Sequence, residues 1–201
     1  AETGVRFGQE ANVSGVATAT AERQYFAGKP YAKSAGARVA LERMITNRLR
    51  LGAQVSALQV DYDDRDDRDG PVFRAGLRLD YAASGRLRLS GAATAIREAT
   101  MAPSEANSQY VFSPALLIAL PWQVNLGLTP RVTFRRFDKA AAIYAVIEEG
   151  ELVDNRREDL TIEMGSSLAV RNFEFGGFRP SLSYRYTENN STVDLFDYNR
   201  H

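Results

Sequence analysis

Apolar and polar side chains alternate at every second position over much of this chain. From Ala35 to Glu42 the odd positions are apolar, while the even positions carry Gly36, Arg38 and Glu42 alongside a small alanine. A period of two is typical of antiparallel β-strands with one apolar and one polar face. We predict strands at 35–45, 73–81, 87–94, 124–135, 160–171 and 178–186, with weaker ones near 4–18, 49–61 and 109–120.

The nine predicted strands differ from those of a water-soluble β-sandwich in length and in the chemistry of their polar positions. Sandwich strands average about five or six residues, whereas a strand that crosses a bilayer needs about 9 to 11, apolar toward lipid and polar toward the interior. The pattern therefore predicts an all-β, antiparallel outer-membrane β-barrel. The charged residues that we expect to face its interior are Arg38, Glu42, Arg74, Arg78, Asp80, Arg131, Arg135, Glu163, Arg179 and Arg185.

Aromatic residues gather near the ends of the predicted strands. Transmembrane barrels carry aromatic girdles at both membrane interfaces. We expect one girdle to include Phe73, Tyr110, Phe112, Phe134 and Tyr186, and the other to include Tyr81, Trp122, Phe173, Phe175 and Phe178. The alternative is that these are ordinary strand-end aromatics of a soluble β domain.

The predicted connections alternate in length, which predicts an orientation. Short connections fall at 46–48, 82–85, 121–123 and 172–177; long ones fall at 19–34, 62–71, 100–108, 137–158 and after Glu188. In outer-membrane barrels the short turns are periplasmic and the long loops are external, so the first strand should rise from the periplasm and the ninth should end outside. Such barrels have an even number of strands. We therefore expect residues 1–201 to be part of a single barrel domain, with a closing strand after residue 201.

Composition removes several classes of function. The 201 residues include 25 basic and 25 acidic side chains, no cysteine, and a single histidine at position 201. Charge neutrality gives no electrostatic footprint for nucleic acid, and the residue types exclude disulfides, zinc-thiolate sites and histidine-based catalysis. No phosphate-binding glycine motif is present. We predict no catalytic residues, no metal and no cofactor.

Two connections carry clustered carboxylates. Residues 61–70 are rich in aspartate and arginine, but counting back from Gly70 does not reproduce the spacing of a calcium-binding EF-hand loop. We interpret them as a solvated acidic loop. Glu148, Glu149 and Asp154 have no apparent positioning partner for acid/base chemistry. The apolar stretch 140–147 is compatible with a short helix, a loop folded into the barrel mouth, or a partner contact.

Two segments resemble a known family, the surface lipoprotein assembly modifiers, also called Slam-type proteins. Residues 22–31, reading ERQYFAGKPY and followed by Gly36, are similar to part of the family's C-terminal barrel. Residues 177–184, reading GFRPSLSY, followed by Asn190-Ser191 and by LFDYNR at 195–200, resemble its last hairpin. In the family an element like Tyr198-Asn199-Arg200 leads into the final strand, and a helical-repeat region precedes the barrel.

This resemblance implies transport without bond-making chemistry: the movement or display of client lipoproteins on the outer surface of the outer membrane. The partners would be the lipid bilayer and surface lipoproteins, and the charged interior residues would face the client or a plug. A passive porin-like channel with the same wall chemistry is the first alternative. An outer-membrane enzyme or a soluble β-barrel binding protein is the second.

Overall fold

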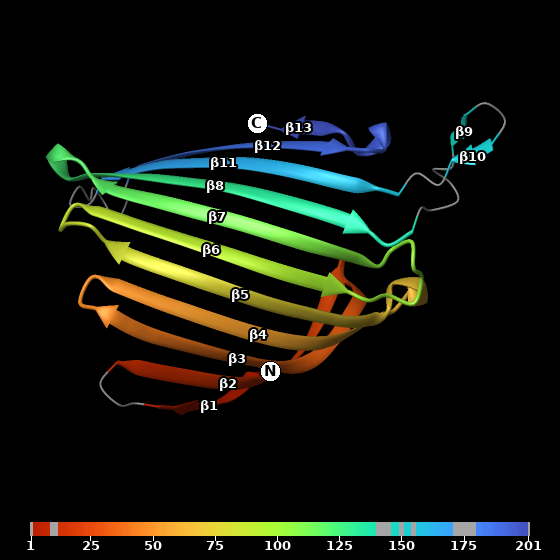
Figure 1. Cartoon of the computed structure of the whole chain (residues 1–201), viewed down its shortest axis with the longest axis horizontal. Helices are drawn as coiled ribbons and strands as arrows, with labels where there is room; N and C mark the ends of the chain where they lie inside the picture. The colour runs from red at the N-terminus through yellow and green to blue at the C-terminus, as the bar shows by residue number, and fades with distance from the viewer. Residues whose placement is uncertain are drawn as a thin grey trace.

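Eleven strands form one antiparallel sheet in chain order, with β1 and β13 at its two edges (Figure 1). This is a computed structural model, and it describes residues 2–8, 12–139, 146–148, 151–153, 156–170 and 180–200. The strands of the sheet are β1 (Glu2–Phe7), β2 (Val13–Phe26), β3 (Lys29–Thr46), β4 (Leu49–Tyr62), β5 (Gly70–Ala82), β6 (Leu87–Glu98), β7 (Asn107–Ala119), β8 (Val124–Phe137), β11 (Glu158–Val170), β12 (Ser181–Ser191) and β13 (Tyr198–Arg200).

The remaining regular elements are short. Strands β9 (Val146–Glu148) and β10 (Glu151–Val153) pair only with each other. Within the described ranges, single-turn 3₁₀ helices are η1 (Asp66–Arg68), η2 (Pro121–Gln123) and η4 (Asp194–Phe196). Among the described residues, no helix is long and apolar enough to cross a membrane.

The strands are long enough to cross the hydrocarbon layer of a membrane. Strand β3 has 18 residues, and β2, β4 and β8 have 14 each. A tilted transmembrane strand needs only about 9 to 11. Most strands of the sheet therefore extend beyond the length that lipid would cover.

The two faces of the sheet have opposite chemistry, and the burial of their side chains is the reverse of that in a water-soluble core. Cross-strand pairing places Val39, Val55 and Ala75 side by side on the apolar face, where Leu77 is 67% exposed and Phe112 is 56% exposed. The polar face is more enclosed, with Asn107 and Gln109 only 3% and 6% exposed. Exposed apolar surface of this extent fits a lipid environment.

The prediction of nine strands is wrong, because the chain turns back twice where we predicted none. The segment predicted near 4–18 contains the end of one strand, β1, and the start of another, β2. Strand β1 therefore runs in the direction opposite to the one that we predicted for the first strand. Strand β2 runs in the predicted direction.

The predicted long connection at 19–34 is also wrong. Residues 13–46 form the β2–β3 hairpin, whose two-residue turn has Ala27 and Gly28 at φ values of 49° and 78°. Two successive positive φ values match the right-handed twist of paired strands. The alternation fades over 19–34 because both faces of the hairpin tip carry polar residues, as in Glu22-Arg23-Gln24.

The predicted long connection after Glu188 is wrong as well, because this segment contains the end of β12 and the whole of β13. Strand β12 continues to Ser191, and β13 pairs with it through Thr187↔Arg200 and Asn189↔Tyr198. Side chains close the turn: Asn189 Nδ2 donates to the Phe196 carbonyl at 2.8 Å, and Asp197 Oδ1 accepts from the Ser191 N–H at 2.6 Å. These local bonds give the segment an ordered return to the sheet.

The remaining connections within the described ranges follow the predicted alternation of lengths. Turns at 47–48, 83–86 and 120–123 lie at one end of the sheet, which we call the short-connection end. Connections at 63–69 and 99–106 lie at the opposite, long-connection end, where β8 ends and β11 begins (Figure 1). The predicted short connection at 172–177 lies outside the described residues.

The ladder between β7 and β8 is interrupted at its middle. Pairing stops after Phe112↔Val132 and resumes at Leu116↔Leu128. The register on both sides of the gap places Pro114 opposite Pro130. Proline has no N–H to donate to a ladder, so this position lacks the two hydrogen bonds that a pair of ordinary residues would make.

Candidate functional site

The polar face of the sheet carries the charged residues that we predicted from the alternation. One row of cross-strand neighbours contains Arg38, Ser56 and Arg74, and continues across the sheet to Arg135 beside Asp159. The neighbouring positions along the strands carry the other predicted residues. All of the following lie on this face: Arg38, Glu42, Arg74, Arg78, Asp80, Arg131, Arg135, Glu163 and Arg185. That the face bounds a lumen stays a prediction.

Two of the predicted site residues fall outside the described part of the chain: Arg179 and the aromatic Phe178. The predicted aromatics Phe173 and Phe175 also lie outside the described residues, and the remaining ones are described. Tyr110 and Phe134 are direct cross-strand neighbours on the apolar face near the long-connection end, where Phe73 also lies. Tyr81 and the exposed Trp122 lie at the short-connection end. Phe112 and Tyr186 lie on the apolar face farther from the strand ends, and a role for any of these rings at a membrane interface stays a prediction.

Ion pairs along the strands neutralise part of the polar face. Arg78 binds Asp80 through two hydrogen bonds of 2.8 and 3.1 Å. Arg131 and its cross-strand neighbour Glu163 are 3.5 Å apart. Arg50 lies 3.8 Å from Glu42. These pairs orient side chains on the polar face, where each exposed pair adds about 1 kcal/mol or less to stability.

Other arginines of the polar face have no such partner. Among the residues that the structure describes, Arg38, Arg74 and Arg135 form no ion pair, and the buried Nε of Arg135 makes no hydrogen bond. The row that contains them spans five strand spacings, or about 24 Å. The polar face thus carries an excess of positive charge in the residues described.

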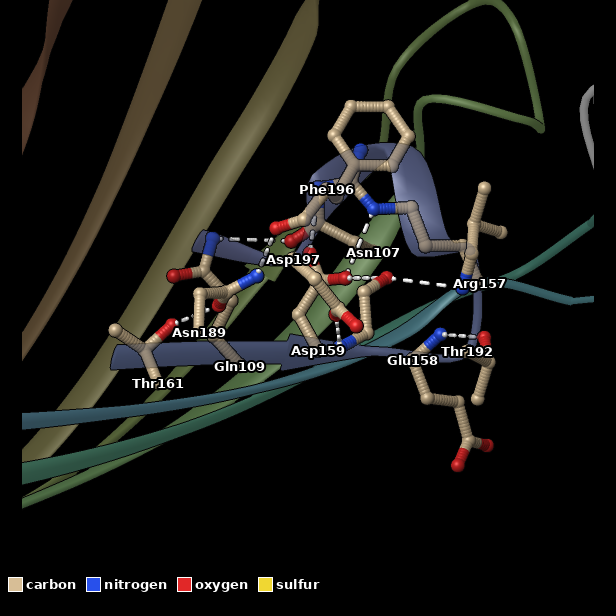
Figure 2. Close-up of polar contacts among 12 residues, drawn as sticks. Asn107, Gln109, Arg157, Glu158, Asp159, Thr161, Asn189, Thr192, Phe196 and Asp197 are labelled. Carbon is tan, nitrogen blue, oxygen red and sulfur yellow. Dashed lines mark hydrogen bonds and ion pairs between the residues drawn. The ribbon is translucent and has the colours of Figure 1, made fainter. Parts of the chain in front are cut away.

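A polar cluster joins β11, β12 and the η4 turn at the long-connection end (Figure 2). Arg157 donates two hydrogen bonds to Asp159, at 2.9 and 2.7 Å, and Asp159 also accepts from the Ser191 hydroxyl at 2.6 Å. Asn189 accepts from Thr161 and donates to the Phe196 carbonyl. The cluster holds the last turn against the sheet through side chains rather than through the backbone ladder alone.

Aromatic rings cover the guanidinium of Arg157. Its central carbon lies 3.3 Å from the centroid of the Phe196 ring and 4.8 Å from that of Phe137. A planar cation stacks well on an aromatic face. Arg157 therefore ties the η4 turn to the end of β8 as well as to Asp159.

A second polar group lies beside this cluster on β6 and β7. Glu98 accepts hydrogen bonds from the side-chain amides of Asn107 and Gln109, at 3.0 and 3.1 Å. Gln109 also donates to the side-chain oxygen of Asn107 at 3.0 Å. Two side-chain amides thus satisfy the partly buried Glu98 carboxylate, and the amides of the buried Asn107 and Gln109 gain hydrogen-bond partners, as buried polar groups require.

Two hollows lie on the polar face. The one near the long-connection end has a volume of about 230 Å³ and mixed charges, with Glu22, Glu98 and Glu105 opposite Lys33, Arg68 and Arg74. The one at the short-connection end has a volume of about 260 Å³ and is lined by Arg48, Arg50, Arg78 and Arg88 with Asp80 as its one carboxylate. We call the second hollow the arginine pocket.

In the acidic segment 61–70, which we interpreted as a solvated loop, basic side chains lie close to the carboxylates. Asp63 lies 3.6 Å from Arg23, and Asp61 lies 3.7 Å from Lys33. Within η1, a side-chain hydrogen bond from Arg65 lowers the pKa of Asp67. Within the described ranges, no group of three or more acidic or histidine side chains is arranged to hold a metal ion. Glu149 and Asp154 lie outside those ranges, and Glu148 and part of 140–147 belong to the β9–β10 ladder rather than to a helix.

Sequence reasoning missed the polar cluster and the arginine pocket. Asn107, Gln109 and Asn189 were not candidates, because an isolated amide in a strand has no sequence signature. Arg48 lies in a turn, where charged residues are common. Only the pairing register shows that these residues meet.

The comparisons with known proteins give one match that spans the chain. A sequence model described as surface lipoprotein assembly modifier matches residues 1–201. No curated protein matches the chain. Among solved structures, the chain is similar to the β domain of the Bordetella autotransporter Brka, with 17% sequence identity and a TM-score of 0.44, over 91% of this chain and 81% of that one.

Proposed function

The chain belongs to the surface lipoprotein assembly modifier family, and on this premise we propose that it moves lipoproteins to, or displays them on, the outer surface of the bacterial outer membrane. The family supports an outer-membrane β-barrel role, and its name describes assembly rather than catalysis. Surface lipoproteins are the proposed clients, and the outer-membrane bilayer is the proposed surroundings of the apolar face.

One observation carries the proposal: large apolar side chains are exposed on the apolar face, whereas the buried polar side chains lie on the polar face. Leu77 and Phe112 on the apolar face are more than half exposed, whereas Asn107 and Gln109 on the polar face are almost completely buried. In lipid this arrangement is stable, because strand pairing satisfies the backbone and polar side chains stay away from hydrocarbon. The polar face would then offer a hydrated path to an extended client.

The charged residues of the polar face are the proposed client contacts. Arg38, Arg74 and Arg135 have no acidic partner among the described residues, so their guanidinium groups are available to carboxylates or backbone carbonyls. Lipid requires that sheet edges be covered, and β1 and β13 are not paired with each other. We therefore propose that residues 1–201 form part of one larger barrel domain.

Deletion of the gene tests the proposal directly. We expect surface lipoproteins to lose their accessibility to an added protease in intact cells, and expression of the wild-type gene to restore it. A periplasmic protein that stays protected throughout serves as the control for membrane integrity. Unchanged accessibility of every surface lipoprotein would contradict the proposal, and a stable, solute-selective conductance in planar bilayers would favour a passive channel instead.

A further inference from the structure

The arginine pocket concentrates positive charge at one end of the polar face. Arg48, Arg50, Arg78 and Arg88 line a hollow of about 260 Å³, and Asp80 is its one carboxylate. Arg50 pairs with Glu42 and Arg78 pairs with Asp80. The other two arginines, Arg48 and Arg88, have no acidic partner among the described residues. A concave site with an excess of one charge attracts ions of the opposite charge.

The pocket is held in place by contacts from three neighbouring strands. Arg50 and Asp80 are direct cross-strand neighbours, and Arg88 is paired with Ala82. The Ala82 N–H donates to the Arg48 carbonyl at 2.8 Å, and Thr46 Oγ1 accepts from the Arg48 N–H at 3.2 Å. The backbone that carries Arg48 is therefore fixed against β5, although its side chain lies in a turn.

The two arginines that do have acidic partners are held by different contacts. Arg78 is oriented by its two hydrogen bonds to Asp80, and Arg50 is drawn toward Glu42 at 3.8 Å. The remaining N–H groups of Arg50 and Arg78, and those of Arg48 and Arg88, can donate hydrogen bonds to further acceptors. Guanidinium groups match carboxylates in a bidentate geometry, so a ligand that carries several carboxylates suits the pocket.

We propose that the arginine pocket binds an acidic segment of the client polypeptide. This inference rests on the proposed function, because it takes the polar face as the surface that a client contacts. In the proposed bilayer placement, lipid and its phosphate groups lie on the side of the apolar face, whereas Arg50, Arg78 and Arg88 lie on the polar face. The short-connection end is the periplasmic end in outer-membrane barrels, which places the pocket where a client would first meet the sheet.

The binding test uses the full-length protein in detergent and a fluorescently labelled peptide containing eight aspartates. We expect the peptide to bind and the double variant R48Q/R88Q to weaken binding at least tenfold. We expect added salt to weaken the wild-type interaction, since exposed charges are screened. The variant R43Q/R86Q removes the same charge at the same end of the sheet, with Arg43 on the apolar face beside Leu51, and should leave the affinity within about twofold.

Three outcomes would overturn the inference. The first is equal binding of a peptide in which asparagine replaces every aspartate. The second is an equal loss of affinity in R48Q/R88Q and R43Q/R86Q. The third is displacement of the peptide by inorganic phosphate at the same molar concentration as the peptide, which would indicate a site for small anions. Lipoprotein display in cells is a separate measurement: if gene deletion leaves display unchanged while the peptide results hold, the proposed function fails and the anionic site remains.

Discussion

Arg157 and Asp159 form a two-bonded ion pair on the enclosed polar face, and Asp159 is only 4% exposed. Asp159 lies at the start of β11 and Arg157 just before it, yet their pair is completed by groups far along the chain. The Ser191 hydroxyl donates to Asp159, and the Phe196 ring covers Arg157. The last turn of the described chain therefore depends on a pair formed more than thirty residues earlier.

Removing the cation of this pair should destabilise the sheet. R157M leaves the Asp159 carboxylate buried without its counter-ion, and we expect the free energy of unfolding to fall by about 3 kcal/mol. Urea titration in lipid vesicles measures the change. R136M is the control, because Arg136 pairs with Glu158 at 3.1 Å on more exposed side chains and should cost about 1 kcal/mol or less. Equal effects of the two variants would contradict the role of burial.

Restoring the missing ladder bonds between β7 and β8 should stabilise the sheet. The double variant P114V/P130T supplies the two absent N–H donors, and each restored hydrogen bond should add about 1 kcal/mol. Either single variant should give about half the gain. Hydrogen exchange is the check, since the amides introduced at 114 and 130 should be protected. Rapid exchange at both positions would show that the interruption has another cause.

Gly36 sits where the backbone of the next strand approaches too closely for a side chain. A Cβ atom at Gly36 would lie 2.1 Å from the Ala57 carbonyl oxygen and 2.8 Å from the Leu58 Cα. We expect G36A to lower the free energy of unfolding by about 1 to 3 kcal/mol, as crowding in a packed site does. G91A is the matched control, because nothing lies within 4 Å of a Cβ there, and it should be neutral or slightly stabilising.

A charge on the apolar face should be far more harmful than the same charge on the polar face. L77R places a guanidinium at a position that is 67% exposed and surrounded by apolar neighbours such as Ala53 and Ala93. Near the middle of a bilayer this costs about 2 to 4 kcal/mol. T94R, on the opposite face of the adjacent strand, should fold normally. The folded fraction in vesicles, measured by heat-dependent gel mobility, distinguishes the two, and equal folding would contradict the lipid assignment.

The carboxyl group of Asp138 offers a pH test outside the strands. A side-chain hydrogen bond from Arg97 lowers the pKa of Asp138 below its usual value. Because the folded pKa is lowered, the stabilisation is present at neutral pH and is lost as the pH falls through the folded pKa. We expect R97Q to return the pKa of Asp138 toward its usual value in an NMR titration, and R131Q to leave it unchanged. An unshifted carboxyl in the wild type would refute the contact.

The sequence alone determined which residues share a face. The alternation around Arg38, Arg74 and Arg135 is a local property of an extended chain, because successive side chains point to opposite sides of a strand. The fold class and the polar face were therefore predictable without a partner for any strand. The β2–β3 hairpin was not, since Glu22-Arg23-Gln24 near its tip are polar on both faces and its Ala27-Gly28 turn carries a weak signal.

Only the tertiary structure decided which charges are neutralised and which are left over. Arg131 meets Glu163, and Arg157 is covered by Phe196, across distances of more than thirty residues along the chain. The arginine pocket likewise exists because three strands and one turn bring their guanidinium groups together. Periodicity fixes the face of each residue, but the register between strands fixes its neighbours, and register depends on the whole sheet.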